Sequence, residues 1–184
     1  IDPVTGLVWD GMNRTGDGTI DKDWRFTYCQ GVFIGASVEM YRVSGDAAYL
    51  EAALRTFRVV LQEFTSRKTG LLPEEGDGDA GLFKGILIRY LVQLAQAAPD
   101  HSEVAEYVAL QAERTWSHLA ADPQQPRFGT DWSQAPKPDI AVSLSSQLSG
   151  VMLMEAAAAL KPKAAQDQSA PRLTSEAAPQ GETP

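Results

Sequence analysis

A chain of 184 residues in which 43% of the side chains are hydrophobic is long enough to bury a core, so we expect a folded domain. The net charge of −8 without any Lys/Arg run argues against a nucleic acid or an anionic membrane surface as partner, and no apolar run is long enough to cross a bilayer. No signal peptide is visible, and the single cysteine, Cys29, excludes an internal disulfide, which leaves the cellular location open with secretion among the alternatives.

Apolar residues recur at steps of three and four along the chain, which predicts five α-helices. We expect them over residues 26–43, 47–64, 80–97, 103–120 and 142–160. Asp46 fits the N-cap of the second helix, and Pro162 ends the fifth. Gly31 and Gly35 lie one turn apart in the first helix, where glycine is costly. We therefore expect another helix or a ligand to approach these two glycines closely.

The last residues have a different composition. Residues 164–184 are rich in Gln, Ser, Pro, Glu and Ala and carry no hydrophobic period, so we expect a disordered tail there. Residues 1–163 would then form the folded domain. No strand pattern competes with the helices, and the fold class predicted is all-α.

The connections between the predicted helices differ in length. Residues 44–46 and 98–101 form short links, whereas residues 1–25, 65–78 and 121–140 form long segments. Short links join antiparallel neighbours, so all three long segments should lie at one end of the array, where the first, third and fifth helices begin. Because long loops inside compact domains are usually functional, this end is the candidate site.

The long segments and the helix starts that follow them combine aromatic rings with carboxylates and amides. They hold Trp9, Asp10, Asn13, Asp17, Asp21, Trp24, Tyr28 and Gln30; Glu74, Glu75, Asp77, Asp79, Phe83 and Lys84; and Arg127, Phe128, Asp131 and Trp132. A sugar ring stacks on an aromatic face, and its hydroxyl groups need donors and acceptors. The set therefore suits a carbohydrate. The alternative is that the aromatic residues only seal the rim of the core.

Four segments resemble motifs of the family-76 glycoside hydrolases, the α-1,6-mannanase type, and occur in family order between Leu7 and about Trp116. They are Asp10-Gly11, residues 26–35, residues 40–46 with Tyr49-Leu50, and Phe83-Lys84-Gly85-Ile86 with Arg89. Residues 26–35 resemble the family signature TYNQG, with Cys29 in place of the asparagine. The resemblance implies the C-terminal half of an (α/α)6 toroid, a partial toroid of five helices in antiparallel hairpins.

The same resemblance implies an enzyme that hydrolyses α-1,6-mannosyl links or transfers among them. In the family two adjacent aspartates carry the chemistry, in a segment ahead of the region matched here. This chain contains no Asp-Asp pair, and a glycosidase needs two carboxyl groups flanking the scissile bond. We therefore expect the catalytic pair upstream of residue 1, no catalytic residue in this chain, and an isolated chain without activity.

The predicted substrate contacts are Asp10, Trp24, Tyr28, Gln30, Lys84 and Trp132. The resemblance implies that Asp10 lies at the cleft floor, and that Tyr28 and Gln30 face the cleft. Lys84 would donate to a sugar hydroxyl or a carboxylate, whereas the two tryptophans are chosen by location only. The alternatives are a loop or cap role for Asp10 and an ordinary first helical turn around Tyr28. For Lys84 the alternative is a solvated surface charge.

Residues 13–21 place oxygen-bearing side chains at alternating positions around glycines, as a calcium loop does. The closing glutamate of that pattern would fall at Trp24, so calcium is only a minor alternative to a polar turn. His101 and His118 belong to no metal or triad spacing. We expect no metal and no cofactor.

Three functions remain open at this point. The first is a segment of an α-mannan hydrolase, and the second is a non-catalytic carbohydrate-binding half-toroid. The third is a helical interaction module, because an incomplete toroid leaves an apolar helix edge exposed. The expected partners are α-mannan or a mannooligosaccharide, together with a missing N-terminal half or a second copy on the open edge.

Overall fold

The computed structural model describes residues 1–119 and 126–161, and five α-helices form in them. They are α1 (Thr27–Ser44), α2 (Ala47–Val59), α3 (Phe83–Ala97), α4 (Ser102–Ser117) and α5 (Leu144–Ala159). A π-helical turn over Val60–Phe64 extends α2, and a 3-10 turn over Gly78–Leu82 precedes α3. In these residues the only β-type pairing is an isolated antiparallel bridge between Met12 and Ile20. The all-α prediction is confirmed, whereas the predicted tail over 164–184 lies outside the described residues.

The helix ends differ from the predicted ones for local reasons. Asp46 caps α2 as predicted, since its carboxylate accepts a hydrogen bond from the N–H of Ala48 (2.9 Å). The fifth helix begins at Leu144 rather than at residue 142 because Ser143 is its N-cap and accepts from the N–H of Ser146 (3.3 Å). The fourth ends at Ser117 rather than near residue 120, which lies outside the described residues. Helix termini are the least sequence-determined part of a helix.

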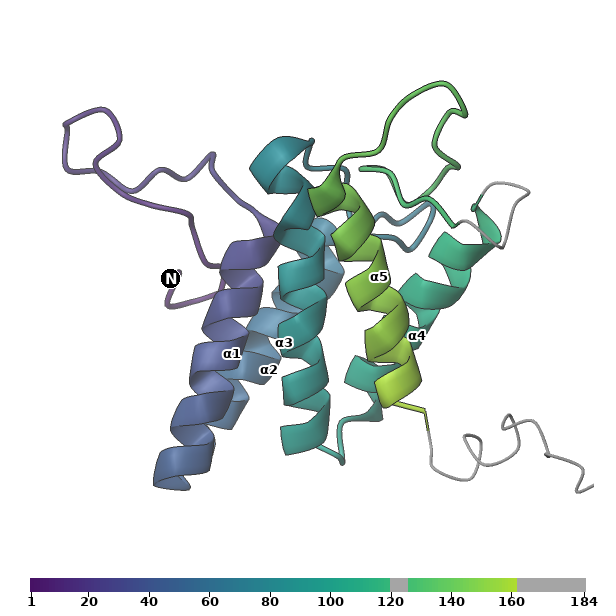
Figure 1. Ribbon diagram of the computed structural model, residues 1–184. Helices are drawn as coiled ribbons and strands as arrows, with labels where there is room; N and C mark the ends of the chain where they lie inside the picture. Colours follow the sequence, from purple (N-terminus) through teal and green to yellow (C-terminus); the bar gives the residue numbers. More distant parts are fainter. Residues whose placement is uncertain (120–125, 162–184) are drawn as a thin grey trace, which may run out of the picture.

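The helices form two layers (Figure 1). Helices α1, α3 and α5 lie side by side in one layer, with α3 in contact with both others, and α2 and α4 lie behind them. The short links lie at one end of the molecule and the long segments at the other, where α1, α3 and α5 begin. The predicted arrangement of antiparallel hairpins with all long segments at one end is confirmed. In the described residues no helix is long and apolar enough to span a membrane.

Glycines allow the helices of the front layer to approach closely. A Cβ on Gly31 would lie 2.7 Å from the Cα of Leu87 in α3, and a Cβ on Gly35 would lie 2.1 Å from the ring of Tyr90. On the other side of α3, a Cβ on Gly85 would lie 2.9 Å from the Cα of Ser149 in α5. The close approach predicted for Gly31 and Gly35 is confirmed, and the approaching group is another helix.

The hydrophobic core lies between the two layers. Its fully enclosed side chains include Ile34, Val38, Phe57, Val60, Leu87, Leu91, Leu94, Val104, Val108 and Leu153. These residues recur at helical spacing on the facing sides of the five helices, so their burial supplies most of the driving force for folding. Helix α5 is different, because Glu155 is the only charged residue in its sixteen positions. A helix that is apolar on nearly all sides is normally buried on nearly all sides, so we expect further contacts on the exposed side of α5.

Two fully buried glutamines attach long segments to the helices. The side chain of Gln30 in α1 accepts from the N–H of Val8 (3.0 Å) and donates to its carbonyl (2.7 Å). Gln111 in α4 accepts from the N–H of Leu72 (3.0 Å) and donates to the carbonyl of Gly70 (2.6 Å). Each amide satisfies backbone groups that would otherwise be buried without partners. The first two long segments are therefore fixed against the bundle by side chains rather than by regular structure.

Candidate functional site

The end of the molecule at which α1, α3 and α5 begin carries most of its buried polar side chains. Glu75, from the second long segment, caps α1: its carboxylate accepts from the N–H of Thr27 (2.8 Å) and from the Thr27 hydroxyl. Burial raises the pKa of Glu75, and the two bonds from Thr27 oppose that shift. The sequence showed Glu75 only as part of an acidic stretch, and its role depends on a contact 48 residues away.

Asp10 and Tyr28, two of the predicted substrate contacts, are hydrogen-bonded to each other. The Tyr28 hydroxyl donates to the Asp10 carboxylate, and the Cys29 sulfur lies 3.6 Å from the same oxygen. The bond to Asp10 and, after it, burial raise the pKa of Tyr28, so the phenol keeps its proton. Burial raises the pKa of the Cys29 thiol to about 11, so this cysteine is a neutral packing group. The pair therefore offers a carboxylate already oriented by one donor.

Aromatic rings surround this pair. Tyr28 packs on Phe83 with ring centroids 4.5 Å apart, and Phe26 lies 5.3 Å from the same ring. Trp24 meets Phe26 edge-on at 6.0 Å and is 41% exposed, with the guanidinium of Arg14 over its ring at 4.6 Å. Of the predicted contacts, Trp24 is thus the ring that presents a face near the surface. An exposed indole beside oriented polar groups is suited to stacking on a sugar.

Gln30 does not lie where the sequence placed it. Its side chain is fully buried, and all of its hydrogen bonds go to the backbone of Val8 and Phe26. The prediction that it faces a cleft is therefore revised: the first long segment folds over it, both amide N–H groups are used, and the enclosed side chain is out of reach of a ligand.

Lys84 and Trp132 are also enclosed, each being 2% exposed. The Lys84 ammonium donates to the carbonyl of Thr130 and lies 4.4 Å from the centre of the Trp132 ring. Burial lowers the pKa of Lys84 to about 8, and the carboxylates of Glu75, Asp131 and Glu74 oppose that shift. Lys84 is thus neither a solvated charge nor a group open to a ligand, and the predicted contacts at these two positions are revised in the same way as that of Gln30.

A cavity of about 340 Å³ lies beside Lys84, between the second and third long segments and the start of α5. Its polar lining includes Glu74, Asp77, Thr130, Asp131 and Ser143. Thr130 donates to Glu74 (2.7 Å), and Ser143 donates to Asp77. The sequence had shown Glu74, Asp77 and Asp131 within the candidate segments, whereas Thr130 and Ser143 carry no local signal.

The aspartates of this cavity are ionised. The hydroxyl of Ser143 and the N–H of Gly78 hold the pKa of Asp77 below its usual value. For Asp131, burial raises the pKa, but hydrogen bonds from Ser133 and Gln134 outweigh burial and the pKa is lowered. Ionised carboxylates held by protein donors are strong acceptors for the hydroxyl groups of an uncharged ligand.

The loop that resembles a calcium site uses its oxygens internally. The Asn13 side chain accepts from the N–H of Gly18 (2.7 Å), Asp17 accepts from Thr19, and Asp21 pairs with Arg14 (3.3 Å). Across residues 1–119 and 126–161 no group of three or more His, Cys, Asp or Glu side chains could hold a metal ion. The polar-turn interpretation describes this loop.

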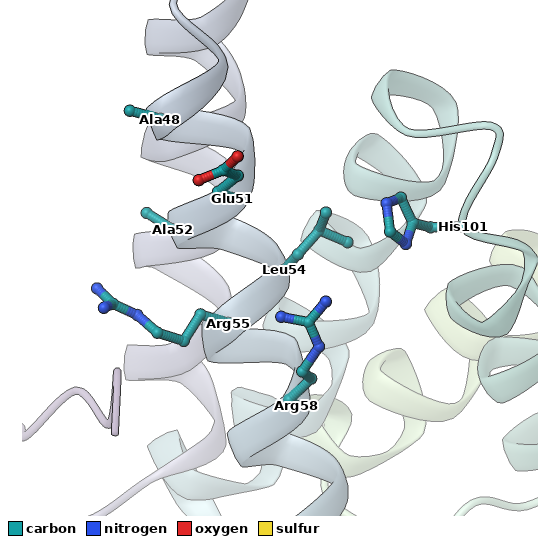
Figure 2. Close-up of a pocket in the computed structure, with 7 residues that line it drawn as sticks. All are labelled: Ala48, Glu51, Ala52, Leu54, Arg55, Arg58 and His101. Atoms are coloured by element: carbon teal, nitrogen blue, oxygen red, sulfur yellow. The ribbon is translucent and has the colours of Figure 1, made fainter. Parts of the chain in front are cut away.

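A second hollow, of about 520 Å³, lies between α2 and the start of α4, away from the polar end (Figure 2). Figure 2 shows Leu54 and Arg58 on the side of α2 that faces His101. His101 is already paired with Glu103 (2.9 Å), and Glu51 lines the same hollow. Because opposite charges are mixed there, this hollow has no consistent preference for a charged ligand.

Residues 1–169 match the sequence profile described as Glycosyl hydrolase family 76. The chain belongs to this family. The family-76 match covers the full length of the described bundle, and the order of motifs seen in the sequence is consistent with it.

Two solved structures share the fold. The chain is similar to the GH76A α-1,6-mannanase of Salegentibacter sp. HEL1_6, with 40% identity and a TM-score of 0.79 over 88% of this chain and 48% of that one. It is also similar to the Lin0763 protein from Listeria innocua, with 37% identity and a TM-score of 0.77 over 85% of this chain and 44% of that one. The chain therefore spans less than half the length of these relatives and has the helical arrangement of part of an α/α toroid. No match was found among curated proteins.

Two further structures of the Salegentibacter enzyme are inactive variants in which two adjacent aspartates are replaced. One holds α-1,6-mannotetraose and the other α-1,6-mannotriose. Dfg5 from Chaetomium thermophilum, in complex with glucosamine, is 21% identical with a TM-score of 0.68 and shows the fold alone. An adjacent aspartate pair does not occur in the 184 residues of this family-76 chain.

Proposed function

We propose that this chain is part of a glycoside hydrolase domain that acts on α-1,6-linked mannan, and that it supplies substrate-binding surface rather than the catalytic pair. The proposal is supported by family-76 membership together with a polar end on which oriented carboxylates adjoin an exposed indole. Glycoside hydrolysis needs an acid and a second carboxylate flanking the scissile bond. We assign these two groups to a part of the domain outside the 184 residues.

The neutral sugar would be bound by acceptors and one aromatic face. Asp10, held by Tyr28, has a free carboxylate oxygen for a sugar hydroxyl, and Trp24 offers a partly exposed ring. Asp131 and Thr130 extend the polar surface into the neighbouring cavity. An uncharged polyol is the ligand class that these groups accept, since a bound anion would be repelled by the ionised carboxylates.

Sugar binding tests this proposal. Tyr28→Phe keeps the ring on Phe83 but removes the hydroxyl that orients Asp10, so affinity for α-1,6-mannotriose should fall roughly tenfold, which corresponds to one charge-assisted hydrogen bond of about 1.4 kcal/mol. Isothermal titration calorimetry would measure it. Tyr41→Phe, the same change in the last turn of α1 at the opposite end of the molecule, is the matched control and should bind as the parent does.

Two results would oppose the proposal. Equal affinity of the parent chain and Tyr28→Phe would remove Asp10 and Tyr28 from the binding surface. Hydrolysis of α-1,6-mannan by the isolated chain would show that the catalytic carboxylates lie within these residues after all.

An apolar groove supports a second role, contact with further protein. It has a volume of about 630 Å³ between α4 and α5 and is lined mainly by small side chains such as Ala109 and Ala157, with Trp116 47% exposed. Helix α2 covers α1, and α4 covers α3 and α5, but on the far side of α5 no described helix continues the outer layer. We propose that the rest of a family-76 domain packs here, and that in the isolated chain a second copy takes its place.

Oligomeric state tests this role. Ala109→Arg places a charge in the groove, so size-exclusion chromatography with light scattering should show more monomer than for the parent chain. Ala48→Arg, an exposed alanine at the start of α2, is the control and should leave association unchanged. A parent chain that is monomeric at high concentration would contradict the self-association.

A further inference from the structure

Lys84 lies where three parts of the chain meet. It is in the first turn of α3, and its ammonium donates to the carbonyl of Thr130 in the third long segment. The ammonium also interacts electrostatically with Glu75 of the second long segment. Below the ammonium lies the Trp132 ring, at 4.4 Å from its centre. The Trp132 indole N–H is buried and has no hydrogen-bond partner. The ring is therefore held by packing and by the cation above it, and not by its own polar atom.

The residues that Lys84 holds are joined to the cavity wall. Thr130, whose carbonyl accepts from Lys84, uses its hydroxyl to bind Glu74 (2.7 Å), and both line the cavity. Asp131, the next residue, lines the same cavity and orders Ser133 and Gln134 around its carboxylate. Moving the backbone at Thr130 would therefore move a donor and an acceptor that face the cavity. A buried charge that fixes the groups around a site is a common way to preorganise it.

We propose that Lys84 is a positioning residue: its ammonium pins the third long segment onto α3 and thereby sets the places of Thr130 and Asp131 in the cavity, without itself contacting the ligand. The ligand class is an uncharged hexose unit, and this assignment rests on the proposed function. The contact by which Lys84 holds the third long segment does not depend on the proposed function.

The charge on Lys84 depends on pH. The carboxylates facing Lys84 are Glu75 and Glu74 from the second long segment and Asp131 from the third, and together they favour the ammonium. Burial nevertheless lowers its pKa to about 8, so the cation is present at neutral pH and is lost a little above it. Loss of the proton removes the attraction to the Trp132 ring and leaves three carboxylates around a neutral amine. Because the pKa of the enclosed amine lies below that of a solvated lysine, deprotonation favours the enclosed position, so the third long segment should stay on α3 while the surroundings of the Trp132 ring change over that pH range.

Nuclear magnetic resonance of the ¹⁵N-labelled chain tests the pin directly. The chain has four tryptophans, and the Trp132 indole signal is identified by its absence in Trp132→Phe. Over a titration from about pH 6.5 to about pH 9.5 this signal should shift with a midpoint near pH 8 in the parent chain. The midpoint should vanish in Lys84→Met, which keeps most of the side-chain volume, and persist in Lys68→Met, an exposed lysine of the second long segment.

Affinity for α-1,6-mannotriose, measured at each pH, links the pin to the cavity. Because the neutral amine stays enclosed and can still donate to the Thr130 carbonyl, the parent chain should keep its affinity across the titration, whereas Lys84→Met should bind several-fold more weakly at every pH. A Trp132 signal that does not titrate in the parent chain, or that titrates equally in Lys84→Met, overturns the pin. If the Trp132 signal shifts with pH but Lys84→Met binds mannotriose as tightly as the parent chain, Lys84 has no role in positioning the cavity residues. If the Trp132 signal shifts with pH but the parent chain binds no mannotriose, the contact between Lys84 and the third long segment is supported and the proposed function is contradicted.

Discussion

Gly31→Val is expected to lower the midpoint of thermal unfolding by roughly 5–10 °C, which corresponds to overpacking of about 2–3 kcal/mol in a domain of this size. A Cβ at this position would lie 2.7 Å from the Cα and 3.1 Å from the backbone nitrogen of Leu87. Those atoms belong to the backbone of α3, so no side chain can rotate away. The two helices would have to separate along their whole contact. Differential scanning calorimetry or circular dichroism at 222 nm would measure the shift.

The control for this change lies on the same helix, at Ala36. Ala36 is exposed, so Ala36→Val introduces the same β-branched residue into the same helix without a backbone opposite it. It should change the midpoint by only a degree or two. A shift for Gly31→Val no larger than that of Ala36→Val would contradict the close approach of α1 and α3.

Gln30→Ala is expected to destabilise the fold by about 2–4 kcal/mol. The substitution leaves the part-buried N–H and carbonyl of Val8 without their partner and creates a cavity where the fully buried side chain was. Urea denaturation would measure the loss. Gln62→Ala, an exposed glutamine in the turn after α2, is the control and should be nearly neutral.

This second prediction also separates two interpretations of Gln30. A substrate contact would lose sugar affinity with little change in stability, because an accessible amide returns to water when it is free. The geometry predicts the opposite order, with loss of stability first and any loss of binding following from disorder of the first long segment. Full stability of Gln30→Ala would therefore restore the cleft-facing role that the sequence motif implies.

Much of the fold could be predicted because its signals are local. Apolar spacing located all five helices, and Asp46 located one helix start, since both depend on residues within one or two turns. Link lengths then placed the three long segments at one end. A pair of glycines one turn apart predicted close approach by another helix or a ligand, and the structure shows that it is a helix. The contact between Tyr28 and Asp10 was not predicted.

Only the tertiary structure decided which polar side chains at that end face a ligand and which are enclosed. Gln30 bonds to a residue 22 positions away, Lys84 to one 46 positions away, and Glu75 caps a helix 48 positions away. Whether such a side chain is solvated or buried depends on which long segment folds over it, and no periodicity or cap records that choice. The chain by itself determined an all-α array of antiparallel hairpins with its long segments at one polar end. Long-range burial then assigned Gln30 and Lys84 to holding that end together, because an enclosed donor or acceptor is normally paired within the protein. Trp132 belongs to the same enclosed set, but packing and the Lys84 cation hold it.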